Sequence, residues 1–217
     1  MIITMLKIEK FEFNMLPVNT YVLYDQNKSA AIIDPGCYTQ IEKETLQRFI
    51  DSNGLKPERL LNTHLHFDHV FGNPFVEDTY GLQTEANDGD LNWLKGIQKR
   101  VRMFGLSYNE TPRPIGRVLN DGDIISFGSI ELLVLHIPGH SPGSLVFYCK
   151  NEGVLFTGDV LFQESIGRSD FPDGNAEALI EGIKNRLFIL PDNTKVFPGH
   201  GLSTTIGHEK KHNFFLR

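Results

Sequence analysis

The stretch Leu60-Leu61-Asn62-Thr63-His64-Leu65-His66-Phe67-Asp68-His69 places four side chains that can bind metal within six residues. The apolar run that precedes them is typical of the end of a buried strand. His64 and His66 are separated by one residue, so in an extended chain both side chains point to the same side. Asp68 and His69 follow where the chain begins to turn and are free to face a second ion. This order predicts a metal site at the edge of a sheet.

The ligand types indicate which metals this site suits. Imidazole and carboxylate groups favour zinc, manganese or iron, and the lack of a thiolate-rich cluster argues against a structural zinc site of the finger type. A single histidine is most often a surface or core residue, and we interpret His136, His208 and His212 in this way. Three histidines and an aspartate at this spacing are better explained by metal binding.

Length and composition fit one large domain of the α/β or β-rich class. The chain has 217 residues, of which 40% are apolar and 22% charged, and we expect residues 1–217 to form a single domain. The formal charge is -6, with 21 basic and 27 acidic residues. Because no basic run could follow a phosphate backbone, nucleic acid is not expected as a partner.

The sequence predicts a cytoplasmic protein that acts on a small molecule away from membranes. Charged residues soon interrupt the N-terminal stretch Met1–Leu6, which therefore lacks the apolar core of a signal peptide. No later stretch is long enough to span a membrane. Cys37 and Cys149 lie far apart and in no metal-binding or redox spacing, which is typical of reduced thiols.

Strands and a helix alternate before the histidine-rich stretch. Thr39 can cap a helix that runs to about Ser52, with Glu42 three residues after the cap. Predicted strands on both sides of this helix fit an α/β layer. The strand before it ends in Asp34-Pro35-Gly36, and the Asp34 carboxylate either supports the metal site or stabilises the turn. We also expect a short strand at residues 80–84.

In the second half of the chain, three apolar runs end in a glycine and then a polar side chain. These polar residues are His140, Asp159 and His200. A glycine lets the backbone turn tightly, which helps to aim the next side chain at a fixed point. Together the three residues supply what a two-metal site lacks. After them we expect a final helix at residues 203–216, begun by Ser203 or Thr204.

The H-x-H-x-D-H pattern at residues 64–69, taken with these three positions, resembles that of the metallo-β-lactamase-fold hydrolases. The resemblance implies an α/β fold of αββα type, in which two mixed sheets are flanked by helices and the metals lie at their common edge. It implies two divalent ions, zinc with iron or manganese as alternatives. One ion would be held by His64, His66 and His140, the second by Asp68, His69 and His200, with Asp159 bridging the two.

Within that family, residues 158–172 look like those of the glyoxalase II-like hydrolases. Asp159, rather than cysteine, at the bridging position argues against a β-lactamase of the commonest type. Only 17 residues follow His200, so we expect no C-terminal helical domain of the kind that helps to bind glutathione in full-length glyoxalase II, and the thiol carrier is left open. Arg168 either binds an anionic part of the substrate or pairs with Asp170 or Glu164 to hold the loop.

The chemistry of such a site favours thioester hydrolysis. Two cations about 3.5 to 4 Å apart can acidify a water and polarise a carbonyl oxygen, and Asp68 could orient the nucleophile or accept its proton. A thiol with a pKa of about 8.5 leaves without protonation, whereas an amine does not. Because the sequence contains no evident dedicated acid, we expect a binuclear hydrolase of small acyl thioesters of the S-lactoylglutathione type.

Other readings stay open at this point. Persulfide dioxygenases resemble this sequence too, and hold one iron through residues matching His64, His140 and Asp159. A non-catalytic metal-binding module has no need of seven ligands, and a nuclease of this fold fits poorly with the acidic balance. Residues 86–105, which include Trp93, form either a lid or wall of the site or an ordinary helix packed on the sheet.

Overall fold

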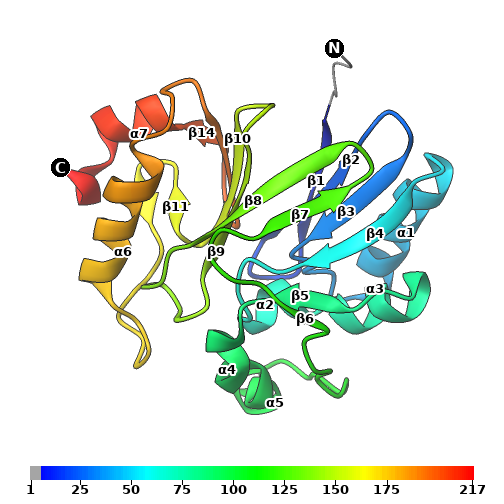
Figure 1. Ribbon diagram of the computed structural model, residues 1–217. Coiled ribbons are helices and arrows are strands. Elements are labelled where there is room, and N and C mark those ends of the chain that lie inside the picture. The colour runs from blue at the N-terminus through cyan, green and yellow to red at the C-terminus, as the bar shows by residue number, and fades with distance from the viewer. Residues whose placement is uncertain (1–5) are drawn as a thin grey trace.

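Two six-stranded sheets pack face to face in the computed structural model, which describes residues 6–217 (Figure 1). Residues 1–5, and with them most of the stretch on which the signal-peptide prediction rests, lie outside the described part. In the first sheet the strands β1 to β3 pair antiparallel and β3 to β6 pair parallel. Its order is β1 (Lys7–Phe13), β2 (Val18–Tyr24), β3 (Ser29–Ile33), β4 (Lys56–Leu61), β5 (Thr84–Ala86) and β6 (Arg117–Val118).

The second sheet is also mixed, because β10 and β13 pair parallel while the other neighbours pair antiparallel. A separate hairpin joins β11 (Leu161–Phe162) to β12 (Ser165–Ile166). The order of the second sheet is β14 (Thr204–Thr205), β13 (Lys195–Pro198), β10 (Val154–Gly158), β9 (Leu145–Cys149), β8 (Ile130–His136) and β7 (Ile124–Phe127).

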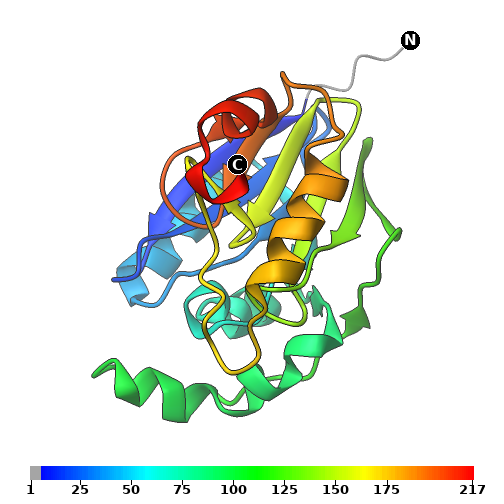
Figure 2. The ribbon, with the colours of Figure 1, turned by 90° about the vertical axis from the view of Figure 1, so that its left-hand side faces the viewer.

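Helices cover the outer faces of both sheets, as the predicted αββα sandwich requires. α1 (Gln40–Ser52) and α3 (Asn73–Tyr80) lie on the first sheet, and α6 (Ala176–Gly182) and α7 (Ile206–His212) on the second (Figures 1 and 2). A π-helical turn, η2 (Ile183–Leu187), continues α6, and a short 3-10 helix, η3 (Phe214–Leu216), follows α7.

Three buried clusters correspond to these layers. Side chains of β2 to β4 meet those of β8 and β9 between the sheets, among them Leu23, Ile33, Leu132 and Phe147. The opposite faces of the same strands pack against the helices, so both sheets are apolar on both sides. On the outer face of the first sheet, Ile32 and Leu60 cluster with Leu46 and Ile50 of α1. On the outer face of the second sheet, Leu155 and Val196 cluster with Leu179 of α6 and Ile183 of η2.

Local signals placed α1 correctly, whereas two predicted elements are displaced. Thr39 and Glu42 form the predicted capping box. The strand predicted at residues 80–84 starts only at Thr84, because α3 extends to Tyr80 and Gly81 ends it with a left-handed φ of 66°. The final helix starts at Ile206, capped by Thr205, because Thr204 and Thr205 pair with β13 instead.

The segment before β6 folds into two short helices, α4 (Leu91–Lys95) and α5 (Ile97–Met103), after a 3-10 turn, η1 (Asp88–Asp90). Ile97 and Val101 pack against α2 (Phe67–Val70) and its neighbours. The two helices separate at Gly96, where Arg100 folds back so closely that a Cβ atom would lie 2.2 Å from its Nη1. Within residues 6–217, no helix combines the length and apolarity needed to cross a membrane.

Backbone hydrogen bonds join the two sheets at one edge. The N–H of Leu145 donates to the carbonyl of Thr63 over 2.7 Å, and the N–H of Asn19 donates to the carbonyl of Gly199 over 2.7 Å. The loops that follow β4, β8, β10 and β13 all end near this edge. Side chains distant in sequence are therefore held close together there.

Candidate metal centre

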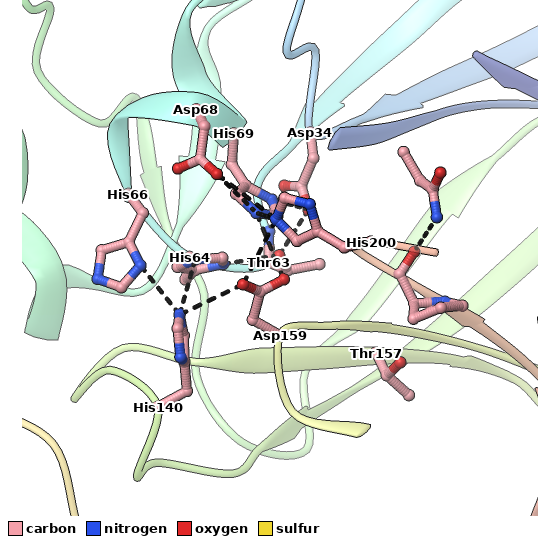
Figure 3. A network of polar contacts seen from close by, with 12 residues as sticks. Asp34, Thr63, His64, His66, Asp68, His69, His140, Thr157, Asp159 and His200 are labelled. Carbon is pink, nitrogen blue, oxygen red and sulfur yellow. Dashed lines mark hydrogen bonds and ion pairs between the residues drawn. The ribbon is translucent and has the colours of Figure 1, made fainter. Parts of the chain in front are cut away.

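Seven histidine and aspartate side chains converge where the two sheets meet (Figure 3). The loop after β4 and the start of α2 supply four of them, and the loops after β8, β10 and β13 supply one each. All are largely buried except one imidazole, whose side chain is 29% exposed. The structure thus brings together every side chain that the sequence nominated as a ligand: His64, His66, Asp68, His69, His140, Asp159 and His200.

Three imidazoles form the first group. Nε2 of His140 lies 3.3 Å from Nε2 of His64 and 2.9 Å from Nδ1 of His66. Ligands bound tetrahedrally at about 2.0 to 2.1 Å from one zinc ion are about 3.3 Å apart, so the spacing fits a single ion. Burial, helped by neighbouring imidazoles, lowers the pKa of His64 well below its usual range and that of His66 to about 3. Both rings are therefore neutral at neutral pH, with a lone pair available.

The second group combines two imidazoles with a carboxylate. Nε2 of His69 lies 3.3 Å from Nε2 of His200, and Oδ2 of Asp68 lies 3.9 and 3.5 Å from these two atoms. Burial lowers the pKa of His69, but the carboxylates of Asp159, Asp34 and Asp68 outweigh burial and raise it well above its usual range. Burial likewise raises the pKa of Asp68, but His69 and His200 lower it below its usual range.

Asp159 lies between the two groups (Figure 3). Its Oδ2 is 3.6 Å from Nε2 of both His140 and His200, and its Oδ1 is 3.4 Å from Nε2 of His69. Among the described residues, the buried Oδ1 has no hydrogen-bond partner. A buried carboxylate oxygen without a partner is rare in proteins and calls for an explanation such as a bound ion. Donor types, spacings and this orphaned oxygen together fit two divalent cations.

Asp34 supports this cluster from behind. Its Oδ2 lies 3.0 Å from Nδ1 of His69 and accepts a hydrogen bond from Oγ1 of Thr63 over 2.6 Å. Oγ1 of Thr63 in turn lies 3.1 Å from Nδ1 of His64. A carboxylate that accepts from one ring nitrogen leaves the other free to bind metal. The sequence left two roles open for Asp34, support of the metal site or stabilisation of the turn. Its contacts with His69 and Thr63 favour the first of these roles.

Sequence reasoning missed several polar residues that hold the site. Asn62 donates to the Asp34 carboxylate and to the carbonyl of His69. Asp90 accepts a hydrogen bond from Ser141, the residue that follows His140. Asn62 and Thr63 directly precede His64 and could have been found from that position. Asp90 belongs to an ordinary turn sequence, Asn87-Asp88-Gly89-Asp90, and no local signal distinguishes it.

A cleft of about 890 Å³ opens beside the cluster. Trp93 forms part of its wall, with its ring centre 4.2 Å from that of His66. The segment of residues 91–104 thus forms a wall of the site, as one of the two interpretations from sequence had it, while its apolar residues Ile97 and Val101 pack on α2 and not on the sheet. The remaining walls are largely apolar: Met15, Leu16, Pro17, Phe67, Met103, Phe104, Phe162, Phe171 and Pro172.

Arg168 lies at the rim of this cleft. Its guanidinium pairs with the Asp170 carboxylate and stacks over Phe171, 4.4 Å from the ring centre. Its carbonyl oxygen lies 2.7 Å from Nδ1 of His140, so the backbone orients that imidazole. The predicted pairing with Asp170 is present, whereas Glu164 contacts His208 instead. The Arg168 side chain remains 64% exposed on the cleft side.

The sequence profile of the Metallo-beta-lactamase superfamily matches residues 14–200. The chain belongs to this superfamily. A Haemophilus influenzae protein named hydroxyacylglutathione hydrolase GloC is 36% identical over 97% of this chain and 98% of its own length. The predicted metallo-β-lactamase fold is thus confirmed in both sequence and structure.

Solved structures agree with this assignment. The B3 metallo-beta-lactamase BLEG-1 superposes with a TM-score of 0.88 at 37% identity, covering 97% of this chain and 99% of that one. The protein TTHA1623, in a di-iron-bound form, superposes with a TM-score of 0.85 at 36% identity, covering 96% of this chain and 100% of that one. Members of the superfamily similar to this chain thus include one that binds two iron ions.

Proposed function

We propose that this protein is a binuclear, metal-dependent hydrolase of small acyl thioesters of the S-lactoylglutathione type. The observation that carries the proposal is the position of Asp159 between two ligand groups. His64, His66 and His140 would hold one ion and Asp68, His69 and His200 a second, with the Asp159 carboxylate placed between the two groups. The likeness to the Haemophilus hydroxyacylglutathione hydrolase supports the substrate class.

The ions, when bound, supply a nucleophile at neutral pH and polarise the substrate carbonyl. The side chains of the site then have separate roles. Asp68 lines the cleft and can accept the proton of the attacking water. Asp34 fixes the ring of His69, and the apolar walls exclude bulk water from the thioester.

The acids along the cleft favour a thiol as the leaving group. Among the described residues that line it, the carboxyl groups are those of Asp68, Asp159 and Asp173. The first two belong to the metal cluster, and Asp173 is exposed on the loop before α6. A thiol with a pKa of about 8.5 leaves as a thiolate without a proton donor, whereas an amine must be protonated. This distinction places thioesters ahead of amides and β-lactams.

The proposal also covers the metal, the cellular location and the partners. The nitrogen and oxygen donors suit zinc, with iron or manganese as alternatives. We place the protein in the cytoplasm, acting as a single domain on a small molecule without a nucleic-acid or membrane partner. Cys37 and Cys149, both buried and unpaired, suit a reducing compartment.

A substrate panel tests the proposal. Protein purified without oxygen is analysed for metal and then assayed with S-lactoylglutathione, other acyl thioesters and a β-lactam, and with glutathione persulfide in an oxygen electrode. We expect two ions per chain and thioester hydrolysis. One iron per chain with oxygen uptake would instead assign a persulfide dioxygenase, and β-lactam turnover without thioester turnover would assign a β-lactamase.

A further inference from the structure

Asp90 joins the two loops that carry the first ligand group. It ends the η1 turn and is fully buried. Its Oδ2 accepts hydrogen bonds from the N–H of Leu65 over 3.2 Å and from Oγ of Ser141 over 2.8 Å. Its Oδ1 accepts a third from the N–H of Gly143 over 2.7 Å. A single carboxylate therefore connects segments 25 to 53 residues away from it in sequence.

The connected residues are neighbours of the three imidazoles. Leu65 lies between His64 and His66, and Ser141 directly follows His140. The N–H of Leu65 therefore fixes the backbone on which two of the rings are mounted, and Ser141 fixes the backbone of the third. The Asp90 carboxylate is hydrogen-bonded to these neighbours and not to the rings themselves.

The contact is packed without spare room. A Cβ atom on Gly143 would lie 2.7 Å from Cγ of Asp90, and one on Gly89 would lie 3.1 Å from the backbone nitrogen of Gly143. The first separation is too short for any real Cβ atom, so a side chain at Gly143 would push Asp90 away, and the second is tighter than most Cβ contacts. The η1 turn therefore lies directly against the His140 loop.

The chemistry of the contact requires a carboxylate. All three partners donate, and an ionised carboxylate accepts at both oxygens without donating. Burial raises the pKa of Asp90, but the hydrogen bonds and nearby His140 oppose the increase. An asparagine of the same shape would turn an amide N–H₂ toward a donor, leaving at least one buried N–H without a partner.

We propose that Asp90 is a positioning residue that sets the separation of the three imidazoles and thereby the affinity of the ion they bind. This inference rests on the metal centre proposed above. Asp34 contacts His69 of the second group directly and reaches His64 of the first group only through Thr63.

Metal affinity of the folded protein tests this role. In Asp90→Asn, we expect the ion of the three-histidine group to bind about 10- to 100-fold more weakly, the range typical of residues that orient metal ligands without binding the ion. The second ion keeps its affinity. Zinc competition with a chromophoric chelator gives both constants, and the absorption bands of the cobalt-substituted protein report the geometry of each group.

Two further variants disturb the contacts of Asp90 while keeping its carboxylate. Gly143→Ala leaves Asp90 intact but forces it away, and we expect the same selective loss. Ser141→Ala removes one of the three hydrogen bonds, and we expect a smaller loss in the same group. Because this variant leaves the backbone contacts in place, it serves as the test if Asp90→Asn does not fold.

The chain offers a matched control in Asp25, a buried carboxylate that also joins two turns. It accepts from the N–H and Oγ of Ser129, each over 3.0 Å, and from the N–H of Asn27 over 2.8 Å. It lies between β2 and β3, at the end of β3 opposite Asp34. We expect Asp25→Asn to lower the melting temperature while both metal affinities stay unchanged.

These measurements decide whether Asp90 positions the imidazoles or only stabilises the fold. Selective weakening of one ion in Asp90→Asn, absent from Asp25→Asn, supports positioning. Equal affinities in Asp90→Asn and wild type would overturn this inference and leave the hydrolase proposal standing. An equal loss in Asp25→Asn would show a general effect of destabilisation and would also overturn it. Wild-type protein that binds no ions would overturn both proposals.

Discussion

Nδ1 of His69 lies 3.0 Å from Oδ2 of Asp34, and both side chains are buried at the edge where the sheets meet. Asp34 adopts a φ of 48°, a left-handed conformation that few residues other than glycine take up. Such backbone strain persists only where surrounding contacts hold it. The Asp34 carboxylate also accepts hydrogen bonds from the N–H and Oγ1 of Thr63. One strained residue thus connects the second ligand group to the backbone that carries His64.

Replacing Asp34 should therefore weaken the ion bound by Asp68, His69 and His200. We expect Asp34→Ala to lower its affinity about 10- to 100-fold, since the His69 ring loses the acceptor that fixes its orientation. Asp34→Asn keeps one acceptor oxygen and should lose less. Zinc competition titrations measure both effects. Unchanged affinity in Asp34→Ala would limit Asp34 to a structural role in the turn.

Asp159→Ala should abolish metal binding at both positions, because its carboxylate contacts imidazoles of both groups. Elemental analysis of the purified variant gives ions per chain. Asp173→Ala is a suitable control, since Asp173 also lines the cleft but is exposed and lies outside the cluster. Retention of two ions by Asp159→Ala would contradict the bridging role.

The seven side chains that converge at the site could be picked out from the sequence because each has a local signal. Four occur within six residues after an apolar run, and three follow a glycine at the end of one. Asp90 has no such signal, since its partners Leu65 and Ser141 lie 25 and 51 residues away and meet it only in the folded chain. Distant pairing also explains the misplaced start of α7, because Thr204 and Thr205 join β13 before the helix can begin.

Metal affinity should depend on pH more steeply in the second group than in the first. Burial lowers the pKa of His69 and His200, but nearby carboxylates outweigh burial and raise both pKa values, so an entering ion displaces up to two protons. In the first group His64 and His66 have lowered pKa values and are already neutral, so an entering ion displaces no proton from these two rings. Binding that releases protons weakens as the pH falls, by about tenfold per pH unit for each proton.

Zinc titrations between about pH 5.5 and 8 measure this difference, over the range in which histidines commonly change charge. We expect the second ion to dissociate first as the solution is acidified, leaving protein with one ion in the three-histidine group. Equal slopes for the two ions would contradict this assignment of protonation states.

Arg168→Ala separates the two roles open to this side chain. If the exposed guanidinium binds an anionic part of the substrate, KM should rise for thioesters with acidic carriers while kcat and the KM for neutral thioesters change little. If the pair with Asp170 only holds the loop, the melting temperature should fall and both substrates should be affected alike.

Asp170→Ala provides the matched comparison for Arg168, because it breaks the same ion pair but leaves the cation at the rim of the cleft. We expect this variant to keep the wild-type KM for acidic thioesters, since the guanidinium stays available and still stacks on Phe171. An identical rise of KM in both variants would show that the ion pair, and not the free cation, matters for the substrate. In that case the loop would change KM through the position of the Arg168 carbonyl, which contacts His140.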